Sequence, residues 1–572
     1  MISEHARTGR AVARPPTPSF SPSRPNALTP RQKLHALALS AALLVAAIAP
    51  LRHAVGAEGT APTANPATTT AAKPATPAID TTGLFKQHCS SCHGENRLGA
   101  MGPALLPESL ERLKKPDALQ TIRNGRTATQ MPAFGQVLST EEIEALSASL
   151  YQPVTPAPVW TEQDIRKSRV QVTDPATLSS KPVFSADPMN LFVVVEGGDH
   201  HVSILDGDKL APIFRFQTHF ALHGGPKFSP EGRFVYFASR DGWLTKFDLW
   251  NLKIVSEVRA GLNTRNAAVS SDGRFVMVAN MLPRNLVLFD ADLNLVKTTE
   301  AASLDGKTIS RVSAVYDAPP RKSFVVAMKD MPELWEISYD EKAPPVFDGL
   351  VHDYKMGEGI AKPGFLPPRR TPLAAVLDDF FFDQGYTHVM GASRDGKGQV
   401  VNLDIRRKVS DLALPGMPHL GSGVTFTWQG EPVMASTNLK DGLVTVISMR
   451  DWRVVRNIPT RGPGFFLRSH SKSPYAFVDS MMSRENKNVL QVIDKQRLEI
   501  VKEFRAPPGK TLAHVEFTRD GRYALASLWE NDGAVIVYDM KTLEEVKRLP
   551  MSKPVGKYNV WNKTQKDEGT SH

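Results

Sequence analysis

The residues of this protein with the clearest chemical potential are two thiols and an imidazole that lie together, Cys89, Cys92 and His93. Two thiols in the pattern Cys-x-x-Cys-His can reach the two vinyl groups of a haem, and the imidazole that follows lies under the iron. No other cysteine occurs in the sequence, so both thiols belong to this motif. The motif predicts one covalent haem c, with Cys89 and Cys92 as attachment points and His93 as a ligand of the iron.

Two other kinds of site use a similar pair of cysteines. A zinc half-site needs further cysteine or histidine ligands at a suitable spacing, and a redox-active dithiol leaves His93 unexplained. Haem attachment accounts for all three residues.

A second axial ligand is expected downstream of the motif. Met131, in the segment Ala128-Thr-Gln-Met-Pro-Ala-Phe, is far enough from His93 to return from the other side of the haem. A thioether ligand raises the reduction potential relative to a pair of histidines, so we expect an electron-accepting or relaying haem. The alternative is that Met131 is only a core residue.

The first 57 residues are typical of a secretory leader. Residues 36–51 are almost wholly apolar, with Arg31 and Lys33 before them and small residues after them. This stretch is short for a membrane span, although an uncleaved anchor is the alternative. We expect a cleaved signal peptide, a periplasmic protein and no integral membrane segment after cleavage.

Removal of this leader changes the net charge of the protein. Residues 1–57 carry seven basic side chains and one acidic one, which is most of the net charge of +10. The remaining protein is only mildly basic, so no nucleic-acid partner is expected.

A small helical domain follows a disordered linker. Residues 58–80 are nearly all Ala, Thr and Pro, whereas residues 81–151 show helical patterns, including a helix over 117–124. A last helix begins with the capping box Ser139-Thr140-Glu141-Glu142 and presents Ile143, Leu146 and Leu150 on one face. Together with the Cys motif, this indicates a small all-α cytochrome c domain.

A different class of structure follows a second linker, residues 152–170. Between residues 171 and 563 an Asp-Gly or Glu-Gly turn repeatedly feeds a β-rich run, as in Phe228-Ser-Pro-Glu-Gly-Arg-Phe, Val269-Ser-Ser-Asp-Gly-Arg-Phe and Phe517-Thr-Arg-Asp-Gly-Arg-Tyr. Such a repeat of four short strands predicts propeller blades. We count eight blades, with seven as the alternative, and expect residues 564–572 to be a tail.

Several histidines of the predicted propeller lie near glycines. They are His223, His419, His470 and His514. A blade-end histidine flanked by glycine can approach a flat cofactor that lies across the channel. Spacing alone does not say which cofactor, and each of these residues has a purely structural role as its alternative.

From about Thr81 to Lys563, the order of elements resembles the cytochrome cd1 family, in which a c-type haem domain precedes an eight-bladed propeller that carries haem d1. The most telling segments are Ala221-Leu-His-Gly-Gly-Pro-Lys, Ser239-Arg-Asp-Gly-Trp and Val555-Gly-Lys-Tyr-Asn-Val-Trp-Asn. The resemblance implies that His223 is the proximal ligand of the haem d1 iron. It also implies that Arg240 and Arg265 hold carboxylates of the macrocycle, against the alternative of surface or packing roles.

The distal side departs from the best-known members of the family, which reduce nitrite with two distal histidines. The first is missing in Asp378-Asp-Phe-Phe-Phe-Asp-Gln-Gly-Tyr, where Phe382 stands at or beside its position, and the second is retained as His419. This pattern is similar to the branch of the family that acts in haem d1 biosynthesis, the dihydro-haem d1 dehydrogenases.

This resemblance implies an oxidoreductase that converts a propionate of dihydro-haem d1 to the acrylate, with His419 as general base and electrons passed to haem c. The tetrapyrrole would be a non-covalent substrate and haem d1 the product. A periplasmic cytochrome or a nitrite reductase would be the partner. The alternatives are a nitrite reductase, a haem d1 carrier without catalysis, and a propeller used for protein contacts.

Overall fold

The computed structural model describes residues 79–565 except 101, 111–112, 127–130, 220–221, 223, 348–360, 394 and 413. The expected leader (1–57), nearly all of the expected linker (58–80), most of the expected tail and His223 lie outside the described residues. Within the described ranges, no helix combines the length and apolarity needed to cross a membrane.

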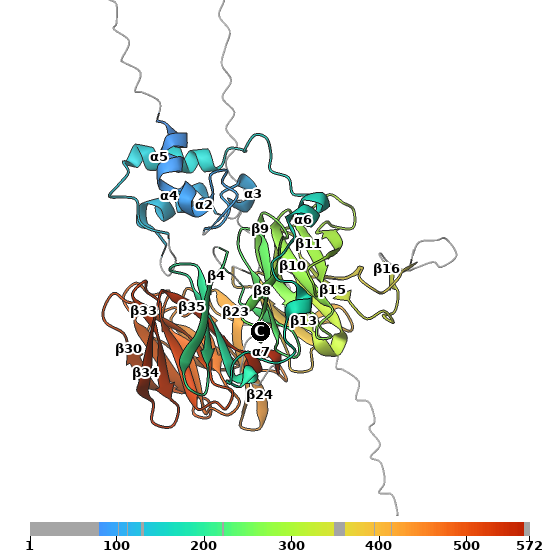
Figure 1. The fold of residues 1–572 in the computed structure, drawn as a ribbon. Helices are drawn as coiled ribbons and strands as arrows, with labels where there is room; N and C mark the ends of the chain where they lie inside the picture. The colour runs from blue at the N-terminus through green and yellow to red at the C-terminus, as the bar shows by residue number, and fades with distance from the viewer. Residues whose placement is uncertain are drawn as a thin grey trace, which may run out of the picture. The chain divides into compact units, whose positions relative to one another are not determined.

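The described residues begin with a small all-α cytochrome domain, as the sequence predicts (Figure 1). Its core contains Phe85, Ile122, Ile143, Leu146 and Leu150, all buried. Its helices are α1 (Thr81–His88), α2 (Ser90–His93), α3 (Pro107–Leu110), α4 (Lys115–Asn124) and α5 (Thr140–Leu150).

Local sequence explains where two of these helices begin. The predicted capping box of α5 is confirmed, because Ser139 Oγ accepts from the Glu142 amide at 3.1 Å and Glu142 Oε2 accepts from the Ser139 amide at 2.8 Å. Helix α4 starts two residues earlier than the expected Asp117. Pro116 lies inside its first turn, where the missing amide hydrogen costs no intrahelical bond.

The rest of the protein is an eight-bladed β-propeller, as predicted. Eight antiparallel sheets of the described residues are the blades, each built on four strands, and a separate two-stranded ribbon makes a ninth sheet. The first sheet consists of β35 (Pro554–Asn559), β2 (Leu191–Glu196), β3 (His201–Asp206) and β4 (Ala211–Gln217). The second consists of β5 (Lys227–Phe228), β6 (Phe234–Ala238), β7 (Trp243–Asp248) and β8 (Lys253–Arg259), with the short β1 (Val170–Gln171) at its outer edge.

The next three sheets follow in sequence order. The third consists of β9 (Asn263–Val269), β10 (Phe275–Leu282), β11 (Asn285–Asp290) and β12 (Leu295–Glu300). The fourth consists of β13 (Val312–Ala318), β14 (Ser323–Met328), β15 (Glu333–Ser338) and β18 (Pro368–Pro372), with the ribbon β16 (Val346–Phe347) and β17 (Ala361–Lys362) inserted. The fifth consists of β19 (Asp379–Phe382), β20 (His388–Ala392), β21 (Gly398–Asn402) and β22 (Arg407–Leu412).

Three more sheets complete the ring. The sixth consists of β23 (Pro418–Trp428), β24 (Glu431–Asn438), β25 (Leu443–Ser448) and β26 (Val454–Pro459). The seventh consists of β27 (Leu467–Ser469), β28 (Tyr475–Asp479), β29 (Val489–Asp494) and β30 (Glu499–Arg505). The eighth consists of β31 (Leu512–Phe517), β32 (Tyr523–Leu528), β33 (Gly533–Asp539) and β34 (Glu544–Met551), and the short helix α7 (Val560–Thr564) follows β35.

The repeated turn predicted from the sequence makes the same bonds in three sheets. In the third sheet, the Gly273 amide donates to Ser270 O and the Phe275 amide donates to Ser270 Oγ, both at 2.9 Å. The turns at Ser229 and Thr518 repeat this pattern. Gly273 has a φ of 73°, which only glycine adopts without strain, so the Asp-Gly signature follows from the turn geometry.

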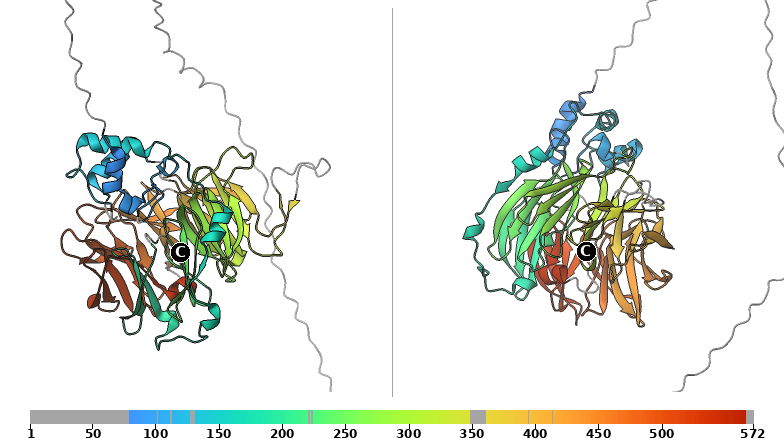
Figure 2. Two further views of the ribbon diagram at one scale, coloured as in Figure 1. Left: turned by 45° about the horizontal axis from the view of Figure 1, so that its top comes forward. Right: turned by 90° about the vertical axis from the view of Figure 1, so that its right-hand side faces the viewer.

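Apolar packing and backbone pairing hold the sheets in a closed ring. Eight clusters of buried apolar side chains fill the eight spaces between adjacent sheets of the described residues. The ring closes where β35 pairs with β2, from Phe192 opposite Asn559 to Glu196 opposite Pro554. Figures 1 and 2 show the green strands of the first sheet beside the red strands near the C-terminal end.

The segment before the propeller is fastened to it by helix α6 (Glu162–Ser168). Ile165 of α6 is 1% exposed and packs among the residues between the second and third sheets. Nearby, Trp160 Nε1 donates to Arg259 O at 3.0 Å, and the Arg259 guanidinium lies over the Trp160 ring. Part of the expected linker 152–170 is therefore packed structure.

We predict that Ile165→Ala lowers the unfolding free energy of the propeller by about 2–4 kcal/mol, because it leaves a cavity between two sheets. The midpoint of guanidinium unfolding, followed by tryptophan fluorescence, measures this loss. The control is Val159→Ala, since Val159 is 80% exposed and its change should leave the midpoint in place. Equal midpoints for both variants would contradict the packing described for α6.

Candidate functional site

The cytochrome domain presents His93 as a ready metal ligand. Cys89 lies between helices α1 and α2, and Cys92 and His93 lie on α2. His93 is 8% exposed. Its Nδ1 lies 2.8 Å from Pro103 O, so the neutral ring carries its hydrogen there and leaves a lone pair on Nε2. Burial lowers the pKa of His93, which favours this neutral form.

The thiols and the neighbouring glycine fit a haem c site. Burial and the nearby Cys92 raise the pKa of Cys89 to about 11, so Cys89 is a protonated thiol at neutral pH. A side chain at Gly102 would meet the His93 ring at 2.7 Å. The described residues hold no group of three His, Cys, Asp or Glu side chains arranged to bind a metal.

Met131 lies at the edge of the same domain. It is partly buried against the apolar core of the cytochrome domain. Its carbonyl oxygen accepts from the Arg126 amide at 3.1 Å. Met131 therefore packs as a core residue, and its role as a ligand of the haem iron stays a prediction.

In the propeller, the two predicted arginines lie close to each other. Arg240 follows β6 and Arg265 is on β9, and the Thr264 amide donates to Arg240 O at 3.2 Å. Burial and then the charge of Arg265 lower the pKa of Arg240 to about 9. Arg265 Nε donates to Ser313 O at 2.8 Å, which fixes its guanidinium. Such a pair of cations out of bulk water is suited to binding carboxylates.

His419 lies close enough to Arg265 for the charge of Arg265 to lower the pKa of the imidazole. It lies on β23 and is partly exposed, and its Nδ1 is 2.8 Å from Phe465 O, so the lone pair of the neutral ring is on Nε2. Burial lowers its pKa, Arg265 and Arg468 lower it further, and Asp379 opposes them. His419 is therefore a neutral imidazole near pH 7, able to accept a proton or bind a metal.

The loop expected to carry the proximal ligand is shaped by two glycines. His223 itself lies outside the described residues, but Leu222 pairs with Ser239 next to it. A side chain at Gly224 would meet Asn266 Cβ at 2.7 Å, and one at Gly225 would meet the Tyr558 ring at 3.0 Å. Both glycines have positive φ angles, so no other residue keeps this loop so close to β9 and β35.

The structure adds residues that sequence reasoning did not assign to the site. Asp379 of β19 lies beside Arg265, and Tyr558 of β35 lies beside the loop of His223. Both residues lie in segments that carry the family resemblance. Asp379 belongs to Asp378-Asp-Phe-Phe-Phe, and Tyr558 belongs to Val555-Gly-Lys-Tyr-Asn-Val-Trp-Asn. Phe382, in contrast, is buried among Phe380 and Tyr386 between the fourth and fifth sheets.

His470 and His514 are both buried, as the structural alternative expects. His470 Nδ1 accepts from the Lys472 amide at 3.1 Å. His514 Nδ1 lies 3.5 Å from Lys557 Nζ, and no hydrogen-bond partner for His514 Nε2 is found among the described residues. Burial and the nearby Lys557 hold the pKa of His514 well below its usual value, so it is neutral.

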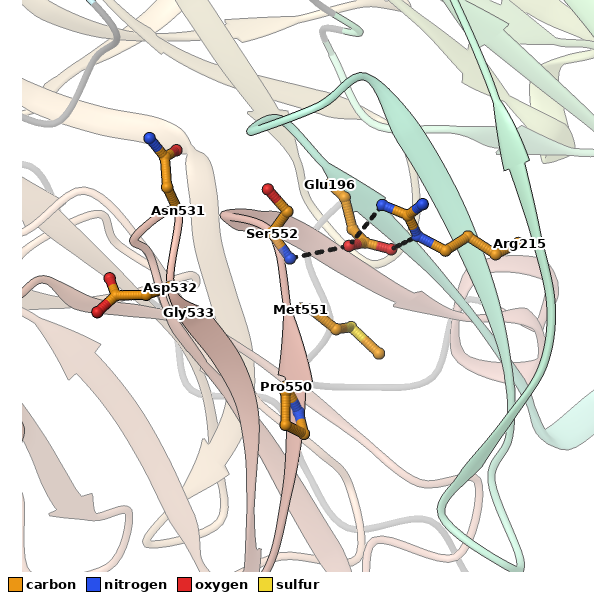
Figure 3. Close-up of a pocket in the computed structure, with 8 residues that line it drawn as sticks. All are labelled: Glu196, Arg215, Asn531, Asp532, Gly533, Pro550, Met551 and Ser552. Atoms are coloured by element: carbon orange, nitrogen blue, oxygen red, sulfur yellow. Dashed lines mark hydrogen bonds and ion pairs between the residues drawn. The ribbon is translucent and has the colours of Figure 1, made fainter.

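A cavity of about 500 Å³ opens elsewhere, between the first and eighth sheets (Figure 3). Across it, Glu196 accepts from Arg215 Nε at 3.0 Å and from the Ser552 amide at 2.9 Å. Its buried carboxylate is thus already bonded to the protein, which indicates that these residues join two sheets.

Comparison with known proteins agrees with this two-domain arrangement. The family model of the cytochrome D1 heme domain matches residues 186–563, and that of the cytochrome C oxidase, cbb3-type, subunit III matches residues 78–148. The chain is 54% identical to dihydro-heme d1 dehydrogenase of Pseudomonas aeruginosa over 86% of this chain and 95% of that protein. It is 25% identical to a nitrite reductase of Stutzerimonas stutzeri, over 84% and 92%.

A solved structure is similar as well. The structure described as dihydro-heme d1 dehydrogenase NirN in complex with DHE aligns with a TM-score of 0.72 and 54% identity, over 84% of this chain and 99% of that one. The match of the family model over most of the sequence, and the high identity over nearly the whole relative, show that this chain belongs to the cytochrome D1 heme domain family.

Proposed function

We propose that this protein is an oxidoreductase that completes haem d1, by converting one propionate side chain of dihydro-haem d1 to an acrylate. The observation that carries this proposal is the propeller site, where the neutral His419 lies in the field of Arg265 and Arg468, and Arg265 also acts on Arg240. The similarity to a dihydro-heme d1 dehydrogenase over nearly its whole length supports it.

The substrate is an anionic tetrapyrrole, and the propeller supplies groups of the matching kind. Arg240 and Arg265 bind carboxylates of the macrocycle, and His223 binds its iron on the proximal side. Gly224 and Gly225 keep the loop of His223 close to β9 and β35, where no larger residue fits.

The reaction breaks two C–H bonds and forms one carbon–carbon double bond, so two protons and two electrons leave the substrate. His419 accepts a proton on Nε2, because Phe465 O already holds its Nδ1 hydrogen. The C–H bonds of a propionate are only weakly acidic, so oxidation of the conjugated ring accompanies proton removal.

Cys89 and Cys92 would hold haem c in the cytochrome domain, and His93 and Met131 would bind its iron. When bound, this haem would supply one-electron redox chemistry. The bond from Pro103 O to His93 Nδ1 orients the imidazole for the iron.

We place the reaction in the periplasm, after cleavage of the leader formed by residues 1–57. The acceptor is a one-electron carrier of that compartment, such as a small cytochrome, and a nitrite reductase is the consumer of haem d1.

Anaerobic incubation of the purified protein with dihydro-haem d1 and a one-electron acceptor tests the proposal. Mass spectrometry of the extracted tetrapyrrole should show the loss of two hydrogens. A bound but unchanged tetrapyrrole would instead indicate a carrier. Reduction of nitrite to nitric oxide by the reduced protein would indicate a nitrite reductase.

We predict that His419→Ala lowers the rate of desaturation about 10²- to 10⁴-fold, the usual contribution of a general base, and leaves tetrapyrrole binding largely intact. Single-turnover absorption measures the rate, and fluorescence quenching measures binding. Full activity in this variant would remove His419 from the role of base. A changed spectrum of the bound tetrapyrrole would show that His419 is an iron ligand.

We predict that Arg240→Gln or Arg265→Gln raises the dissociation constant of the tetrapyrrole about thirtyfold or more, since a charged bond to a carboxylate is lost away from bulk water. The matched control is Arg453→Gln, because Arg453 is an exposed arginine of the sixth sheet. Unchanged affinity in both site variants would mean that the carboxylates bind elsewhere.

We predict that Cys89→Ser and Cys92→Ser each reduce or abolish covalent haem, because each thiol makes one of the two thioether bonds. Haem staining after denaturing electrophoresis measures attachment. The propeller of both variants should still bind the tetrapyrrole, so binding without turnover is expected. A full haem stain in the double variant would contradict the attachment site.

A further inference from the structure

Asp379 is the acidic residue that the structure brings closest to the arginines and the histidine of the propeller site. It is on β19, its side chain is 14% exposed, and its Oδ2 lies 3.9 Å from Arg265 Nη2. Its Oδ1 accepts from the Tyr316 hydroxyl at 2.8 Å and from the Phe380 amide at 2.9 Å. The carboxylate is therefore held by groups from three strands, β9, β13 and β19.

The strand of His419 leaves room for this carboxylate. A side chain at Gly421 would have its Cβ 2.1 Å from Asp379 Oδ2. Gly421 follows His419 by two residues on β23, where the pairing with β24 is irregular between His419 and Val424. The absence of a side chain at Gly421 thus lets the Asp379 carboxylate lie against the strand that carries His419.

The charged groups around His419 act on its protonation in opposite directions. Arg265 of β9 and Arg468 of β27 oppose a positive charge on the imidazole, and Phe465 O and Asp379 favour it. A base that accepts a proton becomes a cation, so Arg265, which favours an anionic substrate, also weakens the base. Among the charged groups found to act on His419, Asp379 is the one with negative charge.

We propose that Asp379 is a positioning residue of the desaturation, whose carboxylate stabilises the imidazolium formed when His419 takes a proton from the propionate of the substrate. This inference rests on the proposed function. In this step one C–H bond breaks, its proton goes to Nε2 of His419, and its two electrons pass one at a time to two equivalents of a one-electron acceptor. The second C–H bond loses its proton to water, and its electron pair forms the carbon–carbon double bond. Tyr316 keeps its hydrogen, because burial and Asp379 hold its pKa well above the usual value, and it fixes the carboxylate.

The test is the pH profile of desaturation by the complete protein with its haem c attached. The base acts when neutral, so the rate rises with pH through the pKa of His419. Removing the negative charge in Asp379→Asn lowers that pKa, so the acid limb should move to lower pH by about one unit, with a lower plateau from the weaker base. Asp379→Glu should restore the wild-type limb.

Asp378→Asn is the matched control. Asp378 precedes Asp379, but its carboxylate pairs with Lys329 Nζ at 3.1 Å and is not among the groups that act on His419. A limb that moves in Asp379→Asn and stays in Asp378→Asn supports the proposal. A limb that stays in both, while wild type still forms haem d1, overturns the role of Asp379 alone. Absence of haem d1 with wild type would overturn the proposed function and this inference together.

A second measurement does not depend on turnover. In the substrate-free protein, the ¹⁵N resonance that His419→Gln removes reports the protonation of this imidazole. Its midpoint should fall in Asp379→Asn and stay in Asp378→Asn. Equal midpoints in wild type and Asp379→Asn would overturn the proposal, even where the activity of the variant is lost through misfolding.

Discussion

Pairing of β35 with β2 is the constraint on which the propeller site depends. It joins the last strand of the described residues to the strands β2 to β4 at the start of the propeller. The apolar cluster between the first and eighth sheets lies at the same junction. Once the ring is closed, the innermost strands of successive sheets lie next to one another. Arg265 on β9, Asp379 on β19, His419 on β23 and Tyr558 on β35 come from different sheets, so no single blade contains the site.

The electrostatics of this site serve two opposed needs. Arginines held out of bulk water attract an anionic macrocycle, but they also disfavour a proton on a neighbouring histidine. Their effect is visible in Arg240, whose pKa falls to about 9, and in His419, whose pKa is also lowered. The Asp379 carboxylate, beside Arg265, favours the imidazolium of His419 while the arginines stay in place to bind the anionic substrate.

Much of the fold was predictable because its signals are local. The Asp-Gly turns need a glycine with positive φ, the capping box of α5 needs only four residues, and the Cys-x-x-Cys-His motif is contiguous. The pattern of apolar residues predicted the ends of helices less accurately. Helix α4 begins before Asp117 because Pro116 is accepted in a first turn, and α6 was hidden in a segment interpreted as linker.

The site was only partly predictable, because its residues meet through the ring and not through the sequence. Asp379 follows another aspartate, and only the structure shows that Asp378 pairs with Lys329 while Asp379 lies over Gly421. Tyr558 lies in a segment whose sequence was noted, but its contact with Gly225 depends on ring closure. His223 lies outside the described residues and stays a prediction.

In the proposed reaction, desaturation in the propeller is coupled to electron removal through the cytochrome domain. The number of electrons released per haem d1 formed measures this coupling, anaerobically and with a one-electron acceptor whose reduction is visible. We expect two equivalents of reduced acceptor per haem d1, and no sustained turnover without an acceptor. Sustained haem d1 formation without any electron acceptor, or reduction of the acceptor without haem d1, would contradict it.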